Sequence, residues 1–235
     1  MIRAIEQIRN TFSEFGIGAG LVFGLAHLLE ICKLPLRLFF YELMIQPVAT
    51  KKMAPPNLAK SFEVREISEG DPLLETTPPP LDVIHSRYRQ DSVCLGAFQK
   101  GVFIGYQWLC FGPYIEDEVR CIFVPQPPSE AVFDFDFYLF PNYRFGLGFV
   151  ALWDAANEYM RERGITTTTS RVSRFNTASR KSHDHLGWCC VGRTIFLKSN
   201  SFQLMLASIR PYVHVSIGRS SGPVIHIGSR ASPRN

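Results

Sequence analysis

The segment from Tyr138 to Phe149 brings together residue types that bind phosphate groups. It reads YLFPNYRFGLGF: a strand-like run, then a turn with two glycines, then the start of a helical pattern. The first N–H groups of a helix have no partner inside it and carry partial positive charge, which favours a phosphate. Gly146 and Gly148 leave space beside this backbone, and Arg144 adds a fork-shaped cation. The segment predicts a pyrophosphate-binding turn; an ordinary turn in which glycine relieves crowding is the alternative.

Two carboxylates precede this turn on an alternating strand, Val132 to Phe140. Asp134 and Asp136 are expected on one face with Tyr138 and Phe140. The other face is expected to carry Phe133, Phe135, Phe137 and Leu139. Residues i and i+2 of a strand lie about 6.6 Å apart, so one carboxyl would raise the pKa of the other in a dry site. Asp134 and Asp136 are therefore candidates for a general base; the alternatives are exposure to solvent or ion pairs with Arg171 or Arg174.

A third group of candidate residues lies in Asn176 to Trp188, NTASRKSHDHLGW. Asn176 or Thr177 can cap a short helix that runs to Leu186. His183 lies on this helix, and an imidazole with a pKa near ~6.5 can exchange protons at neutral pH. A capping or surface histidine is the alternative. The acids Glu116, Asp117 and Glu118 could attract a cationic substrate, although a charged loop is more often only solvated.

The elements that must position these residues form a mixed α/β domain in which strands surround two late helices. Glycine at 164 and 187 is expected to end the two helices. The expected strands are Ser61–Ile67, Val93–Gln99, Val102–Cys110, Val119–Val124, Val132–Phe140, Ile165–Val172 and Trp188–Leu197; the expected helices are Gly146–Arg163 and the one that ends at Leu186. The long helix is expected to bury Phe149, Leu152, Trp153, Ala156 and Met160.

The first 48 residues differ from the rest. Gly16 to Leu29 is an uncharged run of about 14 residues, shorter than the ~20 that a spanning helix needs. We expect residues 1–48 to form an apolar or amphipathic helical segment that contacts a membrane surface, a protein partner or the main domain. Residues 49–60 are expected to be a linker, 61–200 the main domain, and 201–235 an extension with a loose basic tail.

With these motifs in view, the chain resembles the GNAT superfamily of acyltransferases. Its members place Arg before a G-x-G turn at the start of a long helix, and later carry N-x-x-S/A-x-x-x-Tyr-x-x-x-Gly-Phe/Trp. Phe140-Pro141 and Arg144 to Gly148 match the first motif. The second spacing is matched by Asn176, Ser179, His183, Gly187 and Trp188. The resemblance covers roughly residues 61–197 and is specific from about Phe133 to Val191.

The resemblance implies a GNAT-type central mixed sheet flanked by helices, with the N-terminal helical segment as an addition. It also implies acyl-CoA as co-substrate, acetyl-CoA in the simplest case, and transfer of the acyl group to the amine of a small molecule. The implied CoA-binding residues are Tyr138, Leu139, Phe140, Arg144, Phe145, Gly146, Leu147, Gly148, Phe149, Asn176 and Ser179. His183 would protonate the departing thiolate, and Asp134 or Asp136 would accept the proton of the amine.

Two other functions are compatible with parts of the sequence. The turn is one residue shorter than is usual in the family, and His183 stands where Tyr is common; both favour a non-catalytic GNAT-fold protein attached through residues 1–48. Dinucleotide binding is the second alternative, because Gly146, Gly148 and Ala151 fit G-x-G-x-x-A. It is disfavoured because Pro141 to Phe145 separate strand and glycines and no acid ends the next strand.

Charge, cysteine content and histidine spacing limit the partners, compartment and metal sites to be expected. The net charge is +4, of which three charges lie in residues 218–235, so no broad basic face predicts nucleic-acid binding. Six cysteines without a C-x-x-C pair predict mostly buried thiols in a reducing compartment, hence a cytoplasmic protein, which could lie at the inner face of a membrane. His183 and His185 are two apart on a helix and face different ways, so no metal site is expected.

Overall fold

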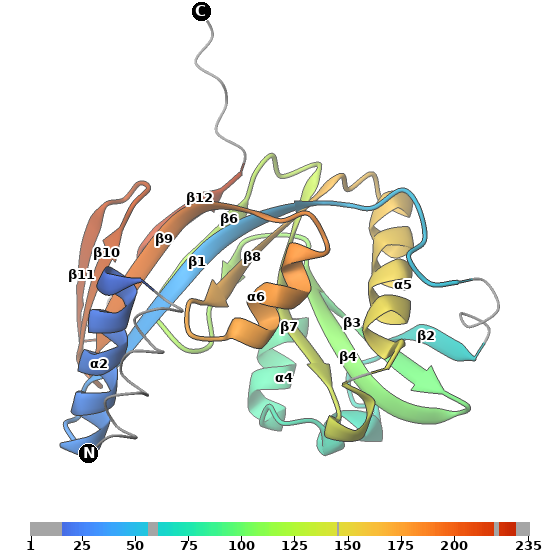
Figure 1. Cartoon of the computed structure of the whole chain (residues 1–235), viewed down its shortest axis with the longest axis horizontal. Helices are drawn as coiled ribbons and strands as arrows, with labels where there is room; N and C mark the ends of the chain where they lie inside the picture. The colour runs from blue at the N-terminus through green and yellow to red at the C-terminus, as the bar shows by residue number, and fades with distance from the viewer. Residues whose placement is uncertain (1–15, 56–60, 145, 219–220, 229–235) are drawn as a thin grey trace, which may run out of the picture.

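The computed structural model describes residues 16–55, 61–144, 146–218 and 221–228. Nine strands form one mixed sheet in the order β11-β10-β9-β1-β8-β7-β4-β3-β2, and three form a small sheet in the order β12-β6-β5 (Figure 1). The strands are β1 Arg37–Pro47, β2 Phe62–Ile67, β3 Ser92–Gln99, β4 Val102–Cys110, β5 Tyr114–Ile115, β6 Ile122–Pro125, β7 Ala131–Leu139, β8 Thr167–Ser173, β9 Cys189–Lys198, β10 Phe202–Ala207, β11 Val213–Ile217 and β12 Val224–Ile227. The helices are α2 Ile17–Ile31, η1 Pro72–Thr76, α4 Leu81–Tyr88, η2 Pro141–Tyr143, α5 Gly148–Glu162 and α6 Thr177–Asp184. This is the mixed α/β architecture with a large central sheet that the sequence predicts.

Helix α5 covers one face of the large sheet, against β2, β3 and β4. Its apolar residues recur at helical spacing, and Leu152, Trp153, Ala156 and Met160 are buried there as predicted. Gly164, with φ +74°, follows the helix. The opposite face carries α4 and η1 on a second apolar cluster, and the small sheet on a third. Both faces of the central strands are therefore buried.

The expectation that residues 1–48 form a helical segment is wrong in part. Residues 37–47 are not helical: they form β1, which lies between β8 and β9 and pairs antiparallel with both. Helix α2 is the only part of residues 1–48 that the structure describes as the expected helix. A strand that is buried on both faces shows a continuous apolar run without period-two alternation, so its pattern is easily taken for that of an apolar helix.

The expected linker and tail are also structured where the structure describes them. The N–H groups of Met53 and Ala54 donate to the Asp154 carboxylate, each at 2.8 Å, so this stretch lies along α5. After the expected last strand, β10 and β11 extend the large sheet, and β12 pairs parallel with β6. The described strands after residue 200, β10, β11 and β12, therefore complete the two sheets.

The placement of β1 predicts a stability effect. Leu43 is fully buried, so Leu43→Ala should lower the free energy of unfolding by about 2–5 kcal/mol through lost burial and a cavity. Leu25→Ala on α2, where the side chain is 48% exposed, should change it by less than about 0.5 kcal/mol. Urea unfolding of both variants tests this; equal, small effects would mean that β1 is dispensable for the folded domain.

Candidate active site

A cleft opens where two parallel strands stop pairing. β7 and β8 are paired only from Ala131–Thr167 to Asp134–Ser170, and β7 continues for five residues without this partner. Figure 1 shows the two strands running apart towards their C-terminal ends. The resulting cleft has a volume of about 190 Å³. Its lining includes Asp134, Asp136, Ser170, Asn176, Ser179 and His183. The candidate catalytic residues and two candidate CoA-binding residues are thus brought together.

A β-bulge at Phe135 changes which way the strand's side chains face. The β4–β7 register places Asp134 opposite Leu109 and Asp136 opposite Trp108, so Phe135 is the extra residue. Phe133 and Phe135 consequently pack in the cluster under the small sheet, whereas Phe137 packs against α5. The expected single face of phenylalanines is therefore wrong beyond the bulge.

The bulge also separates the two carboxylates. The Gln107 amide donates to Asp134 Oδ1 at 3.1 Å, and the Tyr106 hydroxyl donates to Asp136 Oδ2 at 3.3 Å. Tyr106 and Gln107 are consecutive on β4 and so face opposite sides of the sheet. Asp134 and Asp136 are therefore held on opposite sides, and the expectation of a common polar face is wrong.

Asp134 is a carboxyl group whose environment suits proton exchange at neutral pH. It is 5% exposed, and its described side-chain partner is the Gln107 amide. Burial raises the pKa of Asp134 to about 7, the negative charge of Asp136 adds to the rise, and the hydrogen bond from Gln107 opposes it. A group with such a pKa at the point where the strands separate can accept and release a proton.

Asp136 has a different role, because a cation neutralises it. Arg87 of α4 donates to Asp136 Oδ2 at 2.7 Å and to Asp117 Oδ2 at 2.8 Å. Asp136 is 25% exposed, and its ion-pair partner is Arg87 rather than Arg171 or Arg174, the partners considered from the sequence. Its charge is held in an ion pair beside Tyr106, which fixes the carboxylate in place.

The acidic loop is paired with arginines rather than solvated. Arg171 donates to both oxygens of Glu116, whose side chain is fully buried, and also pairs with Glu118 at 3.0 Å. Asp117 shares Arg87 with Asp136. Four carboxylates, those of Glu116, Asp117, Glu118 and Asp136, therefore pair with two guanidinium groups, which leaves an excess of negative charge in this cluster.

His183 is buried and neutral. It is 8% exposed, its Nδ1 lies 3.1 Å from Gln46 Oε1 on β1, and its ring meets Trp153 edge-on at 5.9 Å. An amide oxygen only accepts, so Nδ1 carries the hydrogen and Nε2 keeps its lone pair. Burial lowers the pKa of His183 to about 4. The expected titration near neutral pH is therefore wrong, and a protonated His183 is scarce at pH 7.

Short-range hydrogen bonds position the helix that carries His183. The Asn176 side-chain oxygen accepts from the Ser179 N–H at 3.0 Å, which caps α6 as the sequence predicts. Gly187 adopts φ +73°, just after the helix ends. Asn176 and Ser179 lie at the cleft through this cap.

The end of β7 leads into the glycine turn. Tyr138 and Leu139 pair with β4, and the Phe140 N–H donates to Ile104 O at 3.0 Å. The Arg144 guanidinium folds back: its Nε donates to Leu139 O at 3.0 Å, and its centre lies 5.5 Å from the Tyr138 ring. Phe145 lies outside the described residues.

Helix α5 begins without a side-chain cap, after Leu147, and has no acid in its first turn. The N–H groups of Gly148, Phe149 and Val150 have no partner within the helix. Gly146 is exposed, whereas Gly148 is buried and a Cβ there would come within 3.0 Å of Ile104 Cδ1. Gly148 thus serves packing, and the open backbone is that around Gly146. Phe149 packs on Phe137 at 5.1 Å between ring centres.

No protein-family model and no curated protein sequence matches this chain. Several solved structures are similar to it over part of its length. A Drosophila protein shares 16% identity over 70% of this chain and 52% of its own, with a TM-score of 0.48. A tandem GNAT protein from the clavulanic acid biosynthesis pathway shares 12% over 69% of this chain and 54% of its own, with a TM-score of 0.48. An aminoglycoside N-acetyltransferase in complex with CoA shares 19% sequence identity over 53% of this chain and 90% of its own, with a TM-score of 0.41. This chain spans about half the length of the first two.

The described residues contain no cluster of three or more His, Cys, Asp or Glu side chains arranged to hold a metal ion. The helices within the described ranges lack the length and apolarity needed to cross a bilayer.

The buried Asp134 predicts a pH-dependent stability. Its folded pKa of about 7 lies above that of an unfolded aspartate, about 3.9, so burial of the charged form costs stability above that range. The free energy of unfolding of the wild type, relative to that of Asp134→Asn, should fall as the pH rises from about 4 to about 7. Above pH 7 the difference between the two proteins should stay constant. Urea unfolding at pH 5, 6, 7 and 8 measures the difference; a difference that does not change with pH would contradict a raised pKa.

Proposed function

We propose that this protein is an acyltransferase of the GNAT kind, which transfers the acyl group of acyl-CoA, acetyl-CoA in the simplest case, to the amine of a small molecule. The observation that carries the proposal is the separation of β7 and β8 after Asp134–Ser170, together with the uncapped start of α5 shortly after the end of β7. The motifs at Arg144–Gly148 and Asn176–Trp188 support it from the sequence.

CoA would use backbone groups that the fold leaves open. Residues 135–139 of β7 have β4 on one edge and no β8 partner on the other, so the pantetheine arm can pair with this edge as an added strand. The pyrophosphate would lie at the turn from Arg144 to Phe149, against the first N–H groups of α5. Arg144 would turn from Leu139 O towards the phosphates. Asn176 and Ser179 would contact the arm from α6.

The acceptor amine would enter near Asp134. An ammonium group gives its proton to the Asp134 carboxylate, and the neutral amine attacks the thioester carbonyl. The nitrogen then loses a second proton as the amide forms, and the sulfur gains one as the C–S bond breaks, so the protons balance. The carboxylates around Arg87 and Arg171 would attract a cationic acceptor.

His183 fits this scheme as a neutral hydrogen-bond acceptor rather than as the acid. Its Nε2 lone pair can accept from the attacking amine, while Gln46 fixes the tautomer. Because its pKa is lowered, His183 is largely unprotonated at neutral pH and is a poor general acid for the departing thiolate. Asp136 is a positioning residue, because Arg87 already neutralises it.

The second candidate function is a non-catalytic GNAT-fold protein attached to a membrane surface or a partner. It is favoured by a stripe of leucines on α2: Leu21, Leu25 and Leu28 are 61%, 48% and 56% exposed. Spacings of four and three residues place them on one side of the helix. Binding of acyl-CoA, followed by turnover, separates the two candidates.

CoA binding can be tested at the turn without damage to the fold. Gly146 is exposed and a Cβ there meets nothing nearer than Tyr143 O at 3.7 Å, so Gly146→Ala should bind CoA like the wild type. Gly146→Glu adds a negative charge beside the helix start, and should weaken CoA binding by about tenfold while the folded state persists. Calorimetric titration with acetyl-CoA measures this; no binding to the wild type at millimolar acetyl-CoA would refute the proposed function.

Catalysis can be tested at Asp134 apart from binding. Asp134→Asn keeps the shape of the side chain but cannot accept a proton, so turnover should fall by about 100-fold or more with acetyl-CoA affinity unchanged. The wild-type kcat/KM should rise with pH through about 7. His183→Gln retains an acceptor and should lose less than His183→Phe. Thiol release with acetyl-CoA and a panel of small amines supplies the rates; full activity of Asp134→Asn would exclude Asp134 as the base.

A further inference from the structure

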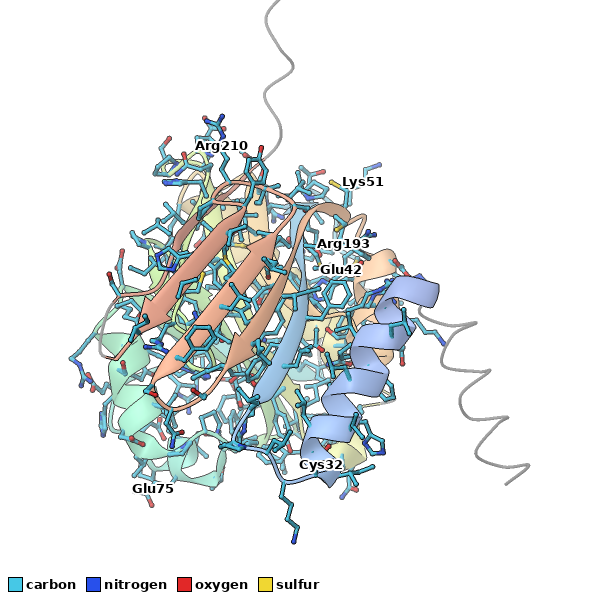
Figure 2. The ribbon with its side chains drawn as sticks, turned by 90° about the vertical axis from the view of Figure 1, so that its left-hand side faces the viewer. Cys32, Glu42, Lys51, Glu75, Arg193 and Arg210 are labelled. Atoms are coloured by element: carbon cyan, nitrogen blue, oxygen red, sulfur yellow. The ribbon has the colours of Figure 1, made fainter. Side chains whose placement is uncertain are left out.

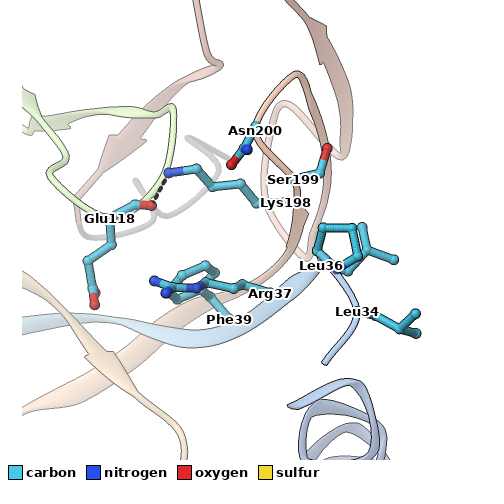
Figure 3. A pocket seen from close by; sticks show the side chains of 9 residues that line it. Leu34, Leu36, Arg37, Phe39, Glu118, Lys198, Ser199 and Asn200 are labelled. Atoms are coloured by element: carbon cyan, nitrogen blue, oxygen red, sulfur yellow. Dashed lines mark hydrogen bonds between the residues drawn. The ribbon is translucent and has the colours of Figure 1, made fainter. Parts of the chain in front are cut away.

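We propose that a second cavity, at the start of β1 and away from the β7–β8 cleft, binds a phosphate group, either free on a small molecule or in a lipid headgroup. Figure 3 shows this cavity, which lies between the first residues of β1 and the turn from β9 to β10. Its volume is about 480 Å³. Its lining includes Leu34, Leu36, Arg37, Phe39, Lys198 and Asn200.

Two cations lie side by side in the lining of this cavity. Arg37 and Lys198 are directly opposite in the antiparallel register of β1 and β9, and so project to the same side of the sheet. Like charges in such a pair are destabilising unless an anion lies between them. Glu118 is the one acid in the described lining, and its carboxylate is already bound by Arg171 and Tyr41. Only the Glu118 backbone carbonyl accepts from Lys198 Nζ (Figure 3).

A third cation adds to the unbalanced charge. Arg120 donates to Gly218 O through Nη1, and its Nη2 is buried with no hydrogen-bond partner. Arg120 is not part of the cavity lining, but its charge acts on Lys198. Burial lowers the pKa of Lys198, the charges of Arg120 and Arg37 lower it further, and those of Glu118 and Glu116 oppose the change. Among the residues that the structure describes, no carboxylate lies at ion-pair distance from any of the three cations.

The remaining lining matches a phosphate that carries an apolar group. Asn200 offers amide donors and Ser199 a hydroxyl, in addition to the two cations. Leu34, Leu36 and Phe39 form the apolar part of the lining, and the same three residues border the cavity under α2. A cavity of 480 Å³ exceeds the size of a phosphate ion, so a phosphate ester with an organic substituent fills it better.

The site is tested with probes that separate the two sources of phosphate. Glycerol 3-phosphate and inorganic phosphate are titrated into the full chain by calorimetry, and vesicles of phosphatidic acid or of phosphatidylcholine are co-sedimented with it. The variants are Arg37→Glu and Lys198→Gln, and the control is Lys51→Glu, a matched charge reversal at an exposed lysine elsewhere.

Arg37→Glu and Lys198→Gln should weaken binding of the phosphate probe by about tenfold or more, and Lys51→Glu by less than twofold. Binding of soluble phosphates identifies a small-molecule ligand; binding only to phosphatidic acid vesicles, with the same variant pattern, identifies a lipid headgroup. No saturable binding to any probe, or an equal loss in Lys51→Glu, would overturn the proposal. Acetyl-CoA titration of Arg37→Glu should be unchanged, so failure here is distinct from failure of the proposed acyltransferase.

Discussion

The separation of two parallel strands is the constraint on which the rest of the site depends. Four residue pairs join β7 to β8, and beyond Asp134–Ser170 the facing backbone groups have no strand partner. Unpaired N–H and C=O groups inside a protein are costly, so such a gap persists only if something else holds the strands. β4 holds β7 along its outer edge, and β1 holds β8 along its full length. The gap is thus built into the sheet and leaves a strand edge for a ligand.

Charge distribution then decides what each carboxylate at the gap can do. Asp136 and Glu116 are each bound by an arginine through a charge-assisted hydrogen bond. Asp134 is bonded to the neutral Gln107 instead, and burial raises its pKa to about 7. The bulge at Phe135 creates this difference, because it sends Asp136 to the side of Arg87 and Asp134 to the other. One inserted residue therefore separates a fixed anion from a proton-exchanging group.

Much of the site could be read from local sequence patterns. The helical period from Phe149 to Met160, the Asn176 cap and the strand before the glycine turn are all short-range features, and all are observed. The bulge could not be predicted, because it depends on the β4 register rather than on β7 itself. The environment of His183 was missed for the same reason: Gln46 is 137 residues away in the chain. Two short apolar runs, residues 38–41 with their aromatic side chains and residues 43–45, were the signal available for β1, and Glu42 divides them.

The N-terminal strand, expected to lie outside the domain, positions α6 over the cleft. Glu42 is 2% exposed and binds Arg174 after β8, Arg180 on α6 and Arg193 on β9, the last pair labelled in Figure 2. Gln46 lies four residues further along β1, so it faces the same side and reaches His183. A buried carboxylate that loses any of these cations would be undercompensated, so the arrangement selects one position for α6. β1 therefore both holds the cleft open, through β8, and fixes the imidazole that faces it, through Glu42 and Gln46.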